Sequence, residues 1–267
     1  MRPIRTISVF PTLLTLGNLI CGFFAIVVAA RIEKPVGKVL LDPTNLMQSG
    51  FLIFVAMIFD GLDGYVARLA RTSSDFGAQL DSLCDVVSFG VAPGFLMVKM
   101  CPQFTVVHNQ AIWIIAAAYA ACAALRLARF NVETNDDDEH LYFSGLPSPA
   151  AAAVIAGFAI MSYTLCQNAT PLKEAANAWL QVILPFLGLL VALLMVSRIR
   201  YPHVTNRILR GQRSFGHVVA VVFFFVAVFV LGGYAVPLSA CAFAFYGPVR
   251  LAWEKWYQRR HREEPLF

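Results

Sequence analysis

Long apolar runs alternate with short polar connections along the whole chain. Each run has roughly the 20 residues that a helix needs to cross about 30 Å of hydrocarbon. No segment shows the regular alternation of apolar and polar residues that is typical of a membrane β-strand. The pattern therefore predicts an all-α polytopic membrane protein with about eight transmembrane helices, at residues 10–30, 47–67, 79–100, 110–129, 148–167, 178–197, 215–232 and 234–251.

Composition supports this fold class. The 267 residues are 58% hydrophobic and only 14% charged, far from the usual balance of a soluble globular protein. The connections between the runs are too short to bury a core of their own, so no soluble domain is predicted. The net charge of +5 has no accompanying motif for nucleic-acid binding. We therefore predict no nucleic-acid partner.

The positive charges are distributed unevenly between the two sides of the membrane. With alternating spans, sixteen of the 21 Lys and Arg residues fall on the side of the N-terminus and five on the other. Because cytoplasmic loops carry an excess of Lys and Arg, both termini are predicted to be cytoplasmic. The protein is then a multi-pass protein of the cell (inner) membrane, and its basic inner face suits anionic membrane lipids.

Four aspartates, Asp60, Asp63, Asp81 and Asp85, are the only acidic residues within or at the ends of predicted spans. A carboxylate at such a position costs about 3 kcal/mol unless it is paired. The spacings of three and four residues place each pair on one face of a helix. The short polar connection at 70–76 makes the two helices antiparallel neighbours. We therefore expect the four carboxylates to converge near the cytoplasmic surface.

Converging carboxylates need cations, because they repel one another strongly. Arg68 and Arg71 are the only basic residues nearby in the sequence, and an all-oxygen site of this charge suits Mg²⁺ or Mn²⁺. Gly64, Ala67 and Gly77 leave the same two helices without bulky side chains at these positions. Singly, such residues are typical of helix packing in membranes. Beside the aspartates, they also indicate room for a bulky ligand.

The spacing D-x2-D-G-x2-A-R-x8-G-x3-D-x3-D is met at every fixed position, and it resembles the signature of the CDP-alcohol phosphotransferases. Four further stretches resemble the phosphatidylserine synthase branch of that family: FGAQLDSLCDVVSFGVAP (76–93), RLARFN (126–131), YFSGLPSPAAA (142–152) and MVSRIRYP (195–202). The chain departs from the branch at Thr12, where asparagine is usual. The resemblance runs from about residue 8 to about residue 202 and predicts a six-helix core at 1–202. The last two predicted spans carry no motif of the family, so residues 203–267 are expected to form two further transmembrane helices and a basic cytoplasmic tail.

The resemblance implies transfer of the phosphatidyl group from CDP-diacylglycerol to the hydroxyl of L-serine, with release of CMP. It also implies two divalent ions, Mg²⁺ or Mn²⁺, and a homodimer. The distribution of positive charge predicts that the active site is cytoplasmic. Attack on a diphosphate suits metal ions held by a carboxylate cluster, which supports the same chemistry independently. The implied metal ligands are Asp60, Asp63, Asp81 and Asp85, with Asp85 also the catalytic base; the implied CDP-diacylglycerol site comprises Asp60, Gly64, Ala67, Arg68 and Gly77.

Two arginines could bind the serine substrate. Arg126 and Arg129 lie at the cytoplasmic end of the fourth predicted span, and a guanidinium can grip the carboxylate of an amino acid through two hydrogen bonds. The alternative is that both arginines belong to the basic inner face and contact lipid phosphate.

Three other functions compete with this one. A sister enzyme would use glycerol 3-phosphate, inositol phosphate or choline as the acceptor, and the branch-like stretches argue against it. A divalent-cation transporter would also place carboxylates in the membrane, but near the midplane and usually in repeated halves. Here all four lie in one hairpin. A purely structural membrane protein would have no reason to tolerate them.

Overall fold

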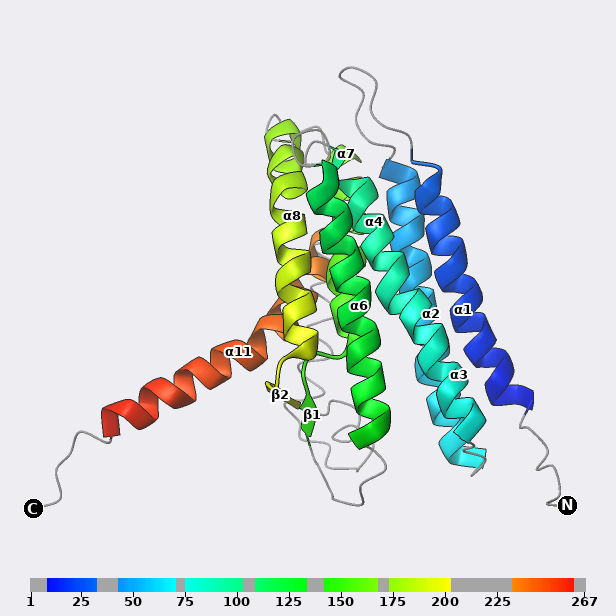
Figure 1. Cartoon of the computed structure of the whole chain (residues 1–267). Helices are drawn as coiled ribbons and strands as arrows, with labels where there is room; N and C mark the ends of the chain where they lie inside the picture. The colour runs from blue at the N-terminus through cyan, green and yellow to red at the C-terminus, as the bar shows by residue number, and fades with distance from the viewer. Residues whose placement is uncertain are drawn as a thin grey trace, which may run out of the picture.

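The computed structural model describes residues 9–32, 43–70, 75–102, 109–133, 142–167, 173–202 and 232–261, and within these ranges the chain is nearly all helical (Figure 1). The elements, in chain order, are α1 (Val9–Ala30), α2 (Pro43–Ala70), α3 (Asp75–Asp85), η1 (Val86–Val91), α4 (Ala92–Met100), α6 (Asn109–Glu133), β1 (Tyr142–Ser144), α7 (Ser148–Gln167), α8 (Lys173–Val196), β2 (Arg200–Pro202), η2 (Gly232–Tyr234) and α11 (Ala235–His261).

Seven segments of the described chain are long and apolar enough to cross a membrane: Pro11–Ala30, Pro43–Ala67, Phe76–Met100, Gln110–Val132, Ser148–Gln167, Ala178–Val196 and Gly232–Gln258. They confirm the prediction of an all-α polytopic membrane protein. The predicted span at 215–232 lies outside the described residues, apart from Gly232.

The third span is the centre of the bundle. It runs through α3, η1 and α4, and a larger share of its apolar stretch is buried inside the protein than in any other candidate span of the described chain. η1 is a π-helical turn and not the plain helix expected at 79–100. Pro93, in the first turn of α4, has no amide hydrogen for the regular i→i−4 bond, which is a physical cause for the break in the α-helical pattern. Gly94 allows close packing on α6, because a Cβ there would lie 3.1 Å from the carbonyl oxygen of Ala116.

A short antiparallel ribbon closes one end of the bundle, and the apolar pattern did not predict it. Phe143 of β1 pairs with Tyr201 of β2, which brings the segment before α7 to the segment after α8. Gly145 follows β1 with a φ of +88°, and its N–H donates to the carbonyl of Ile199 at 2.9 Å. Glycine adopts this backbone conformation without steric cost. The ribbon thus fixes the start of α7, which carries a residue of the candidate site.

Tyr201 joins the ribbon to α11. Its side chain is buried, and its hydroxyl donates to the carbonyl of Ala244 at 2.8 Å. In a regular helix this carbonyl accepts from the amide of residue 248, but Pro248 has no N–H. Gly247 makes room for the ring, because a Cβ there would lie 2.7 Å from Cζ of Tyr201. Burial raises the pKa of Tyr201 to about 12, so the hydroxyl keeps the proton that it donates at neutral pH.

Tyr201→Phe should therefore lower the free energy of unfolding by about 1 kcal/mol or more, because the Ala244 carbonyl loses its donor. In a Pro248→Ala background the new amide can reach that carbonyl, so the same change should cost less. Thermal unfolding in detergent of the two single variants and the double variant measures the difference. Tyr246→Phe, at a tyrosine that is exposed on the same helix, is the matched control. An equal cost of Tyr201→Phe in both backgrounds would contradict this role for the hydroxyl.

Candidate active site

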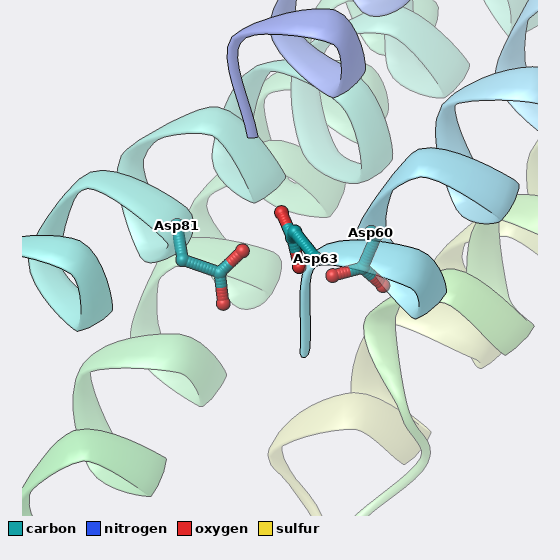
Figure 2. A group of neighbouring side chains, drawn as sticks. All are labelled: Asp60, Asp63 and Asp81. Atoms are coloured by element: carbon teal, nitrogen blue, oxygen red, sulfur yellow. The ribbon is translucent and has the colours of Figure 1, made fainter. Parts of the chain in front are cut away.

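The structure brings three of the four aspartates together. Asp60 and Asp63 extend from α2 toward Asp81 of α3, as Figure 2 shows. One carboxylate oxygen from each residue lies within 4.8 Å of the others. The spacing of three residues on α2 and the short connection to α3 produce this geometry. The predicted convergence of the two helices is confirmed for these three side chains.

The three carboxylates have the chemistry of a divalent-cation site. Asp63 is 5% exposed. Two buried oxygens, Oδ2 of Asp63 and Oδ1 of Asp81, have no hydrogen-bond donor among the described residues. Buried carboxylate oxygens without a donor are rare and costly, so each needs an explanation. A hard cation such as Mg²⁺ or Mn²⁺ prefers all-oxygen ligands and would satisfy both atoms. The donor set therefore fits the predicted metal.

Asp85 lies beside this group of three and not within it. Its Oδ1 accepts a hydrogen bond of 2.9 Å from Nδ2 of Asn18, on α1. Asn18 is itself fully buried, and its main-chain carbonyl accepts from the Ser88 hydroxyl at 3.0 Å. Asp85 is thus oriented by a neutral amide and still interacts electrostatically with Asp60 and Asp81. A carboxylate that is oriented but outside the cation group is suited to handling a proton.

Arg126 is a buried cation beside the aspartates. It lies on α6, is 8% exposed, and interacts electrostatically with Asp85 and Asp60. Its Nη1 donates to the hydroxyl of Ser148, the first residue of α7, at 2.8 Å. A buried position beside carboxylates differs from that of an arginine on the lipid-facing surface. Arg129 is placed differently, because its Nη1 donates to the carbonyl of Val196 at the end of α8, at 3.4 Å.

The remaining predicted residues lie on the two helices that carry the aspartates. Gly64 and Ala67 are half-buried on α2, and Gly77 is half-buried on α3. Arg68 is the next residue on α2, and its side chain is outside the described part of the structure. Gly64 and Ala67, which have no bulky side chain, follow Asp63 along α2. They are in place to line a ligand that approaches the carboxylates.

Sequence reasoning missed the contribution of α1. Asn18 contacts Asp85, and the Thr15 hydroxyl contacts both the Asp63 carboxylate and the carbonyl of Pro11. A signal was present, since Asn18 is a fully polar residue in the middle of an apolar run of the predicted first span. Polar residues within spans indicate function on the same grounds as the aspartates.

The sequence profile of the CDP-alcohol phosphatidyltransferase family matches residues 8–196. A CDP-diacylglycerol–serine O-phosphatidyltransferase of Methanocaldococcus jannaschii is 38% identical over 208 residues, which are 78% of this chain and 79% of that protein. A protein of the same name from Helicobacter pylori is 36% identical over 205 residues, 75% of each chain. An archaetidylserine synthase of Methanothermobacter thermautotrophicus is 30% identical over 205 residues, 76% of this chain and 73% of that one.

The matched region begins just before α1 and ends with α8, so it contains all four aspartates, Asn18 and Arg126. Its extent agrees with the resemblance carried by the aspartate spacing. This chain is a member of the CDP-alcohol phosphatidyltransferase family.

Proposed function

We infer that this protein transfers the phosphatidyl group from CDP-diacylglycerol to the hydroxyl of L-serine, producing phosphatidylserine and CMP. The observation that carries this proposal is that the names of these relatives all refer to serine. Two of the relatives match three quarters or more of the chain at 36–38% identity. The cluster of Asp60, Asp63 and Asp81 supports phosphoryl chemistry independently.

In the proposed reaction, the hydroxyl oxygen of serine forms a bond to the phosphatidyl phosphorus of CDP-diacylglycerol. The bond between that phosphorus and the bridging oxygen breaks, and this oxygen leaves with CMP. Asp60, Asp63 and Asp81 would hold the divalent ions, two Mg²⁺ or Mn²⁺ by the resemblance. When bound, these ions shield the phosphate oxygens and neutralise charge on the departing CMP. Asp85 orients the serine hydroxyl and takes its proton, and Asn18 holds that carboxylate in place. We assign Asp60, Gly64, Ala67, Arg68 and Gly77 to the CDP-diacylglycerol site.

We place the serine carboxylate on Arg126. Arg126 is buried and lies beside Asp85. A serine molecule whose carboxylate is bound by Arg126 would therefore have its hydroxyl near Asp85. Ser148 fixes the guanidinium by accepting a hydrogen bond from Nη1, and the ribbon fixes Ser148. Arg129 donates to the carbonyl of Val196 at the end of α8, so we assign it a secondary part in serine binding.

Purified protein with CDP-diacylglycerol and Mn²⁺ should release CMP much faster with L-serine than with glycerol 3-phosphate, inositol phosphate or choline. Omitting the acceptor is the control for hydrolysis of the donor. The same assay tests the serine pocket: Arg126→Lys keeps the charge but loses the bidentate grip, so it should raise KM for serine more than Arg129→Lys does. If glycerol 3-phosphate is the better acceptor, the acceptor assignment is wrong while the family stands.

We further propose that both termini and the active site face the cytoplasm, at the inner membrane. The uneven distribution of Lys and Arg supports this orientation, and the start of α1, the end of α6 and the β ribbon lie toward one end of the bundle (Figure 1). A Gln258→Cys variant in a cysteine-free background should react with a membrane-impermeant thiol reagent only from the cytoplasmic side, because Gln258 is exposed on α11. Reaction from outside would reverse this orientation.

The catalytic core is assigned to residues 1–202 and the C-terminal addition to 203–267, which agrees with a family match that ends at residue 196. A homodimer is the predicted assembly, and the mass of the detergent-solubilised protein by light scattering would test it.

A further inference from the structure

The C-terminal half of α11 continues past the bundle. Up to Gly247 the helix packs on α7 and on Tyr201. Figure 1 shows that it then leaves the bundle beside the ribbon and extends away from it. Between residues 249 and 258, every side chain that the structure describes is exposed except that of Leu251, which is half-buried.

This projecting segment carries an aromatic stripe. Tyr246, Val249, Trp253 and Trp256 follow one another at intervals of three or four residues, and Tyr257 lies four residues after Trp253, which places all five on one face of the helix. Their exposed fractions are between 51% and 66%. The rings of Trp253 and Trp256 contact each other with centroids 5.8 Å apart. An exposed helix face made mostly of aromatic side chains marks an interaction surface, and Trp and Tyr favour the headgroup level of a bilayer.

The same segment is basic. Residues 249–261 contain Arg250, Lys255, Arg259 and Arg260 against a single acid, Glu254. Glu254 accepts from Arg250 at 2.8 Å, so one pair of charges is balanced within the helix. A second copy of this chain would bring the same positive charge to this segment and would be repelled. An anionic phospholipid surface complements the positive charge of the segment. Aromatic residues combined with Lys and Arg are typical of helices that lie in the membrane interface.

Residues 249–258 belong to the last segment of the described chain that is long and apolar enough to cross a membrane. We propose that residues 249–261 instead form an interfacial helix that binds the anionic phospholipid surface of the membrane. The aromatic stripe lies at the boundary between headgroups and acyl chains, and the basic residues bind the anionic headgroups. The bond from Tyr201 to the Ala244 carbonyl and the space at Gly247 hold α11 where it leaves the bundle. This binding surface is separate from the carboxylate site and does not depend on the proposed reaction.

Tryptophan fluorescence of the full-length protein tests this proposal. Trp113→Phe and Trp179→Phe leave Trp253 and Trp256 as the only tryptophans of the chain. The protein is reconstituted into vesicles of phosphatidylcholine, or of phosphatidylcholine with an equal amount of phosphatidylglycerol, each containing lipid brominated near the headgroup. In the anionic vesicles we expect blue-shifted emission and strong quenching. The triple change Lys255→Gln, Arg259→Gln and Arg260→Gln should weaken that quenching about twofold or more.

Arg198→Gln, at an exposed arginine outside the segment, is the control and should leave the quenching unchanged. Water-like emission without quenching in both vesicles would overturn the proposal. Equal quenching in neutral and anionic vesicles, insensitive to the triple change, would overturn the preference for anionic lipid. Blue-shifted emission without quenching that disappears on dilution with lipid would assign the surface to a second copy of the chain, which also overturns the proposal.

Discussion

Asp60→Ala should reduce CMP release by on the order of 10³-fold, because it removes one of the three carboxylates that converge between α2 and α3. The remaining pair, Asp63 and Asp81, offers too few ligands to hold a divalent ion firmly. Metal binding and CDP-diacylglycerol binding should therefore fall together with turnover. Electron paramagnetic resonance of Mn²⁺ measures the first, calorimetry the second and single-turnover assays the third.

Glu254→Ala is the matched control, since it removes an exposed acid that pairs with Arg250 on α11, far along the chain from the site. It should leave Mn²⁺ binding and CMP release unchanged. Undiminished Mn²⁺ binding by Asp60→Ala would contradict the assignment of the cluster as the metal site.

Asp85→Asn should reduce turnover by on the order of 10²-fold or more while metal and CDP-diacylglycerol binding stay within a few-fold of wild type. The amide is nearly isosteric, and its oxygen can still accept from Nδ2 of Asn18. It cannot take a proton from serine. Calorimetric binding of the donor and single-turnover CMP release separate the two effects.

Glu254→Gln is the corresponding acid-to-amide control for this experiment. If Asp85→Asn loses donor binding as completely as Asp60→Ala, then Asp85 is chiefly a metal ligand. The base would then have to be another group. The position of Asp85 outside the group of three favours its assignment as the base.

The sequence by itself determined the fold class and the central part of the site. Hydropathy over about 20 residues is a local property, so apolar runs predict membrane spans without knowledge of their neighbours. The aspartates of α2 and α3 could be predicted to converge because helical periodicity and a short connection fix their relation locally. For Asp60, Asp63 and Asp81 the structure confirms that geometry.

Only the tertiary structure decided which distant groups pair with one another, in the site and elsewhere in the bundle. Asn18 reaches Asp85 across 67 residues, and Tyr201 reaches the Ala244 carbonyl across 43 residues. A polar residue in an apolar run signals that it has a partner, but not which one. In a membrane, helices choose their neighbours through close packing of small residues and a few polar contacts, not through hydropathy, so these pairings follow from the packed bundle and not from any local pattern.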